Sequence, residues 1–169
     1  MRDRWHSWIL GALLLGCALV NAQQTNPPGG TTSAMKHAHG TFDVKLTPQK
    51  PDSKEAESAK LGRMAISKQF HGDLEGTSDG EMLYNASPSS ESGAYVAIER
   101  VTAKLDGHTG SFDLQHLGVK DAGKQSLSIN VIPGSGTGEL KGISGKLDIQ
   151  IDKDGKHSYD FEYALPQDK

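Results

Sequence analysis

The chain has 169 residues, enough for one domain, and its 18 basic and 21 acidic side chains give a formal net charge of −3. A protein that binds nucleic acid normally carries a basic stripe, so this balance argues against that class. Hydrophobic residues make up only 35% of the chain, whereas glycines number 20. Both values are typical of an all-β domain, because a strand with one exposed face needs apolar side chains only at alternate positions.

The N-terminal segment has the features of an export signal. A basic start precedes an apolar run at residues 8–20, which is too short to span a membrane comfortably. Small side chains then provide a cleavage site after Ala22. We expect residues 1–22 to be a signal peptide and the mature protein to be secreted or periplasmic. Alternatively, the only cysteine, Cys17, lies in a loose lipoprotein box and anchors the chain to a membrane through a lipid.

Residues 23–35 are rich in Pro, Gly, Thr and Asn without periodicity, which predicts a flexible tether, and the domain proper is expected over residues 36–169. Within it, alternation of apolar and polar side chains predicts β-strands. The predicted strands lie at residues 37–46, 61–74, 81–86, 95–105, 110–119, 124–132, 146–152 and 157–165. Three segments between them are predicted as a loop or short exposed helical turn (48–59) and as turns (75–80 and 120–123).

These elements indicate an all-β fold class. Antiparallel strands that each have one apolar face must close or stack to hide those faces, and a closed barrel also removes exposed strand edges. We therefore predict a single antiparallel eight-stranded β-barrel rather than a sandwich.

A glycine-rich stretch at residues 133–145 is typical of phosphate-binding loops at first sight. The ending Gly-Lys-Ser/Thr that such a loop requires is missing, and nothing helical follows. We interpret the stretch as a tight turn between two strands.

Residues 138–145 resemble the glycine-rich segment of the allene oxide cyclase and dirigent-type barrels. The run over residues 39–165 is more closely similar to the family called domain of unknown function 3224. The matching segments are residues 70–76, 98–101, 105–107, 110–112, 115–118 and 131–140. The resemblance implies a small calycin-like barrel of the allene oxide cyclase type, and it implies no activity.

The hairpin at residues 95–119 places one acid, Glu99, and one imidazole, His116, on otherwise apolar faces of adjacent strands. A two-residue turn at Gly107 and His108 would set the two directly opposite each other, and a four-residue loop would make them diagonal neighbours. We expect them to meet on the apolar face in either register. Burial should raise the pKa of Glu99, and contact with an imidazolium should lower it again.

Such a pair could act as general acid and base in a barrel cyclase or isomerase. Alternatively, the pair is structural: either a buried Glu–His hydrogen bond, or Glu99 paired with an arginine such as Arg63. The sequence leaves these alternatives open.

The first function hypothesis is a barrel that holds a small apolar ligand in an open lumen. The predicted ligand-binding side chains are apolar or aromatic and share the inward phase: Phe70, Leu74, Tyr95, Phe112, Tyr159 and Phe161. The alternatives are catalysis by Glu99 and His116, and a structural role in which outward residues such as Val96 and Ile98 form a homo-oligomer interface.

His37 and His39 share a strand face in the manner of a metal-binding pair, but no neighbouring carboxylate or cysteine in the sequence completes a ligand set. We therefore predict no metal site and no cofactor. The sequence also lacks a Gly-x-Ser-x-Gly elbow and a His-Glu-x-x-His motif.

Overall fold

Eight β-strands follow one another in the computed structural model, which describes residues 34–86 and 91–166. Their bounds are β1 Lys36–Gln49, β2 Gly62–Gly72, β3 Leu74–Ala86, β4 Gly93–Leu105, β5 His108–Asp121, β6 Lys124–Val131, β7 Ser144–Ile151 and β8 His157–Ala164. The predicted signal peptide, Cys17 and residues 23–33 of the predicted tether lie outside the described residues.

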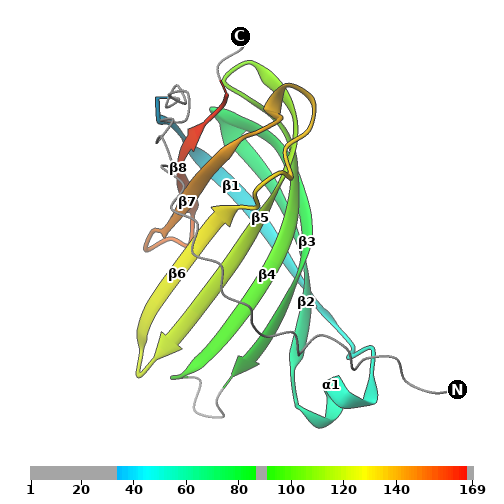
Figure 1. Ribbon diagram of the computed structural model, residues 1–169. Helices are drawn as coiled ribbons and strands as arrows, with labels where there is room; N and C mark the ends of the chain where they lie inside the picture. The colour runs from blue at the N-terminus through cyan, green and yellow to red at the C-terminus, as the bar shows by residue number, and fades with distance from the viewer. Residues whose placement is uncertain (1–33, 87–90, 167–169) are drawn as a thin grey trace, which may run out of the picture. The chain divides into compact units, whose positions relative to one another are not determined.

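Each strand pairs antiparallel with the next, and β8 pairs with β1, so the sheet closes into a barrel (Figure 1). The prediction of an all-β, single antiparallel eight-stranded barrel is therefore confirmed. Helix α1 (Lys54–Ser58) falls within residues 48–59, where a loop or short helical turn is predicted. Within the described ranges, no helix has the length and apolar composition needed to cross a membrane.

The β4–β5 hairpin turns at Asp106 and Gly107, one residue earlier than the predicted two-residue turn. Both residues have positive φ, 49° and 88°, which is the conformation of a type I′ turn. The register therefore places Glu99 opposite Leu114, so both registers proposed from the sequence are wrong. Glu99 and His116 are diagonal neighbours, because His116 lies two residues after Leu114 along β5. A four-residue loop would instead have placed His116 two residues before the partner of Glu99.

Residues 75–80 are also not the predicted turn. Strand β3 runs continuously through them, and the chain reverses before them, between the end of β2 at Gly72 and the start of β3 at Leu74. The small residues that predict a turn here, Gly76, Ser78 and Gly80, occupy the inward positions of the strand. They lie beside larger inward side chains on both neighbouring strands: Phe70, Lys68 and Ile66 on β2, and Ala103, Val101 and Glu99 on β4. Small residues on β3 thus leave room inside the barrel for its neighbours.

One end of the barrel is packed with apolar side chains. The glycine-rich stretch, which includes the 3-10 helix η1 (Gly138–Leu140), packs against β5 at this end instead of forming only a tight turn. Its backbone bonds to the strand through Thr137 N–H and the Ser111 carbonyl at 2.8 Å. Leu140 and Ile143 are buried in the core, so the stretch closes this end of the lumen.

The outer face of β3, β4 and β5 carries a row of exposed apolar side chains. They are Leu83, Val96, Ile98, Leu117 and Val119. Val96 lies between Leu83 and Leu117 in the strand register, so these side chains are contiguous. We call this set the outer apolar face.

Leu140→Ala should show that the glycine-rich stretch is part of the core. Leu140 is 0% exposed, so its truncation should lower the free energy of unfolding by about 2–5 kcal/mol, measured by urea unfolding. The matched control is Leu117→Ala, the same change at a position 50% exposed, which should cost less than about 0.5 kcal/mol. Equal costs for the two variants would contradict a core role for the stretch.

Candidate functional site

Four polar side chains meet inside the barrel, at inward positions of four consecutive strands. They are Lys68 on β2, Ser78 on β3, Glu99 on β4 and His116 on β5. All four are buried. We call this group the polar cluster.

The Glu99 carboxylate is the centre of the polar cluster. Lys68 Nζ donates to its Oε1 at 2.7 Å, and His116 Nε2 donates to the same oxygen at 3.0 Å. Ser78 Oγ donates to the other oxygen, Oε2, at 3.0 Å. Every buried side-chain nitrogen and oxygen in the described part of the chain has a hydrogen-bond partner. The cluster therefore satisfies the condition under which buried polar groups are tolerated.

Glu99 is an anion in the folded protein. Burial raises the pKa of its carboxyl group, but the hydrogen bond from His116 and the positive charge of Lys68 outweigh burial and lower the pKa from 4.5 to about 2. An ionised carboxylate only accepts hydrogen bonds, so Nε2 of His116 carries the hydrogen. Burial and the imidazole are the two opposing effects expected from the sequence, and the ammonium group of Lys68 adds to the lowering of the pKa.

Sequence reasoning missed two members of the cluster, Lys68 and Ser78, and Ser78 lies in residues 75–80, which are predicted as a turn. For Lys68, the sequence does contain a signal: a positively charged side chain interrupts the alternation of apolar side chains along β2. Its Nζ also lies 5.1 Å from the ring centroid of Phe42 and 5.9 Å from that of Phe70, within range of cation–π attraction. The arginine considered as a partner for Glu99, Arg63, instead bonds to Glu81.

Five of the six predicted ligand-binding residues do not line an open lumen. Phe70, Leu74, Phe112, Tyr159 and Phe161 are at most 4% exposed and belong to one core cluster. Their rings pack on one another, with Phe112 stacked on Phe161 at 5.5 Å and Phe70 edge-on to Tyr159 at 5.7 Å. Tyr159 also donates its hydroxyl to the backbone oxygen of His71. The expectation of an open lumen at these residues is corrected: their inward phase is right, but they fill the packed end.

The sixth residue, Tyr95, lines a cavity of about 400 Å³ at the opposite end of the strands. The inward side chains around this cavity are Met82, Tyr84, Tyr95, Leu127 and Ile151, from β3, β4, β6 and β7. The register places His116 two residues along β5 from Gly118, which also lines the cavity. The polar cluster thus lies between the cavity and the packed end along the strands.

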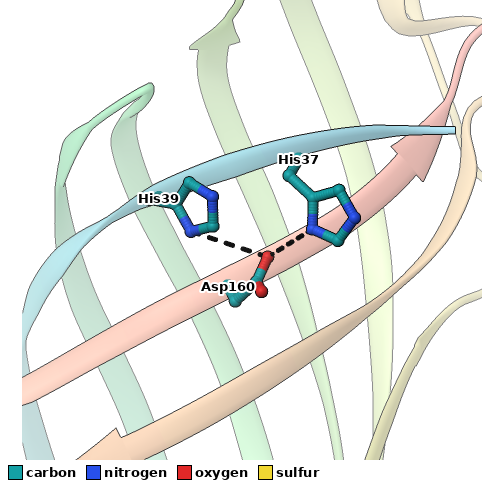
Figure 2. A group of neighbouring side chains, drawn as sticks. All are labelled: His37, His39 and Asp160. Carbon is teal, nitrogen blue, oxygen red and sulfur yellow. Dashed lines mark hydrogen bonds and ion pairs between the residues drawn. The ribbon is translucent and has the colours of Figure 1, made fainter.

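The outer surface holds a second group of polar side chains. His37 and His39 on β1 do have a carboxylate neighbour, Asp160 of β8, and Figure 2 shows both imidazoles directed at one of its oxygens. The expectation that no carboxylate completes this pair is wrong. Closure of β8 onto β1 brings the two segments together across more than a hundred residues of sequence.

Fold and interior define the class: a small closed antiparallel β-barrel with one packed end, a buried ion pair and an apolar cavity at the other end. Residues 38–163 match the family model described as "Protein of unknown function (DUF3224)". The chain belongs to the DUF3224 family, as the resemblance in its sequence predicts.

Solved structures include similar chains. One is the crystal structure, at 1.84 Å resolution, of a Shewanella oneidensis MR-1 protein with unknown function from the DUF3224 family. Its sequence is 42% identical to this chain, and the two structures superpose with a TM-score of 0.72. The similarity covers 80% of this chain and 100% of that one. A search of curated proteins found no match.

Glu99 should make stability depend on pH in the acid range. Because the fold lowers its pKa from 4.5 to about 2, its contribution is complete above pH 4.5 and is lost as the pH falls towards 2. The lowering corresponds to about 3 kcal/mol, of which about 2 kcal/mol should be gone at pH 3. Urea unfolding at pH 6 and pH 3 measures the loss.

The control is the double variant Lys68→Met with Glu99→Leu, which replaces the ion pair by apolar side chains. It should fold, and its loss of stability between pH 6 and pH 3 should be smaller than that of the wild type by about 2 kcal/mol. Glu99→Leu alone leaves the Lys68 charge buried without a partner and should cost about 3–5 kcal/mol at neutral pH. If the wild type and the double variant lose the same free energy, Glu99 is not the ionised group described here.

Proposed function

We propose that this domain binds a small apolar molecule in the open end of the barrel. The observation that carries the proposal is the cavity of about 400 Å³ lined by inward apolar and aromatic side chains. Its volume lies within the range of about 300–1,000 Å³ that is typical of small-molecule sites.

Two tyrosines give the cavity its shape. In the register, Tyr84 and Tyr95 are cross-strand partners, and each has a glycine on its other side, Gly62 and Gly118. A Cβ atom on either glycine would lie 2.0 Å from the neighbouring tyrosine ring, so each ring occupies the space above its glycine. The two rings therefore lie towards opposite neighbouring strands, an arrangement that favours an open space between them.

Apolar side chains remain exposed at this end although their strand phase points them inward. Leu127 is 42% exposed and Ile151 is 63% exposed, whereas inward residues at the packed end are buried. Each square ångström of apolar surface removed from water contributes roughly 25 cal/mol. A bound apolar molecule would cover these side chains, which gives a driving force for binding.

Tyr95 adds a polar group to this apolar site. Burial and the negative charge of Glu99 raise the pKa of the Tyr95 hydroxyl, so the phenol keeps its proton at neutral pH. A neutral phenol donates a hydrogen bond, which would orient a ligand that carries an oxygen or nitrogen atom.

The cyclase or isomerase alternative has less support. Glu99 is fully buried, and both of its oxygens are bonded to other side chains of the polar cluster. A carboxylate with a pKa of about 2 is a weak proton acceptor at neutral pH, and the ideal catalytic base has a pKa near the working pH. These observations favour the structural interpretation of the Glu99–His116 contact.

A homo-oligomer stays a prediction, favoured by the outer apolar face. A groove of about 320 Å³ lies at this face beside Leu83, Val96 and Ile98. Light scattering should then give at least twice the mass of one chain, and Val96→Lys should return a monomer. A monomeric wild type at high micromolar concentration contradicts this role.

Binding should be detectable with N-phenyl-1-naphthylamine, an uncharged apolar dye whose fluorescence rises in apolar surroundings. Leu127→Arg places a charge at the cavity and should weaken dye binding by about tenfold or more, since tenfold corresponds to only about 1.4 kcal/mol. Gly118→Ala should also weaken binding, because the added Cβ displaces the Tyr95 ring.

The matched control is Leu117→Arg, the same substitution at a similarly exposed position of the outer apolar face. This variant should bind the dye as the wild type does. Weaker binding in Leu117→Arg with unchanged binding in Leu127→Arg would place the dye on the outer face and would sink the proposal.

A further inference from the structure

The outer surface of the barrel carries a group of three side chains of types that bind metals, on the opposite face of the sheet from the inward side chains of the proposed apolar site. His37 and His39 come from β1, and Asp160 comes from β8 (Figure 2). One ligand atom from each residue lies within 4.8 Å of the other two. From this geometry we propose that the three residues bind a first-row transition-metal dication such as Zn²⁺.

The closed sheet builds this arrangement from regular strand geometry. Residues two apart on a strand share a face, so both imidazoles lie on the outer face of β1, while Ala38 between them is buried in the core. Asp160 is the direct cross-strand partner of His39, which sets its carboxylate beside both rings. The rings stack with centroids 5.9 Å apart and an angle of 13° between their planes.

The three atoms that would bind the metal already lie close together. His37 Nδ1 donates to Asp160 Oδ1 at 2.8 Å, and His39 Nδ1 lies 3.6 Å from the same oxygen. Ligands at about 2.0–2.1 Å from a tetrahedral zinc ion are separated by roughly 3.3 Å. The two nitrogen–oxygen separations bracket that value, and the two imidazole nitrogens lie within 4.8 Å of each other, so rotation of the side chains would bring all three ligand atoms around one metal ion.

The charges around the three residues favour a cation. Asp148 lies directly opposite Asp160 on β7, and Glu162 lies opposite His37. The neighbouring cation, Lys146, bonds to Glu162 at 2.9 Å. With Asp73, whose Oδ2 accepts the backbone N–H of His39 at 2.8 Å, four carboxylates and one ammonium group lie near the two imidazoles, so the surroundings are negative and favour a cation.

The ligand types indicate the class of metal. Two imidazole nitrogens with one carboxylate oxygen suit zinc, copper or nickel, whereas calcium and magnesium prefer sets made of oxygen. All three side chains are about half-exposed, so water would complete the coordination sphere. A simple exposed His–Asp ion pair is the competing interpretation, and it predicts no specific metal binding.

The test is isothermal titration calorimetry of the full chain, prepared without an affinity tag and freed of metal with a chelator. ZnCl₂ should bind the wild type, and MgCl₂ should give no binding heat at the same concentration. His39→Ala and Asp160→Ala should each weaken Zn²⁺ binding by about tenfold or more, since the loss of even an indirect metal-site partner costs about 10–100-fold.

A second exposed His–Asp pair provides the matched control. His71 Nε2 lies 3.4 Å from Asp43 Oδ2, and no third ligand residue is grouped with them in the described part of the chain. His71→Ala removes one exposed histidine, as His39→Ala does, and should bind Zn²⁺ as the wild type does.

With Cu²⁺, electron paramagnetic resonance should show coupling to two nitrogens in the wild type and one in His39→Ala. Equal Zn²⁺ affinities in the wild type, His39→Ala and Asp160→Ala, or no binding at all, would overturn the proposal.

Discussion

The ion pair between Lys68 and Glu99 is the constraint on which the interior of this barrel depends. Burying either charge alone would cost several kcal/mol, so the two must stay together, and Ser78 and His116 donate further hydrogen bonds to the Glu99 carboxylate. The small inward residues of β3 give this group the space it needs. The pair therefore fixes a polar layer in the lumen, with packed aromatic rings towards one end of the strands and an apolar cavity towards the other.

Much of the fold can be predicted from the sequence, because a period of two along a strand depends only on local order. The exact register cannot: matching apolar faces fixes only whether the paired residue numbers sum to an odd value, and the turn at Asp106 and Gly107 sets the offset. Alternation also predicts which side chains point inward, but not how far along the barrel each one lies. Residues of the packed core and residues around the cavity therefore have the same pattern in the sequence. Asp160 reaches its partners only when β8 closes onto β1, and no local pattern identifies it. Lys68 interrupts the alternation along β2, but that local signal does not identify Glu99, two strands away, as its partner.

The proposed function follows from the difference between the two ends of the barrel. Membership of the DUF3224 family assigns no ligand, so only the chain's own residues indicate what the barrel binds. Inward side chains that stay exposed around a cavity are hard to explain as core, and two tyrosines seated over glycines leave room for an occupant. A metal bound by His37, His39 and Asp160 would lie on the outer surface and would not need that occupant.

The most direct test of the central claim is a crystal structure of the protein grown with an uncharged apolar dye. Density for the dye is expected inside the barrel, between the rings of Tyr84 and Tyr95 and against Leu127, with the polar cluster unchanged beyond it. Density only on the outer apolar face at Val96, or an open end that the protein's own side chains fill, would contradict it.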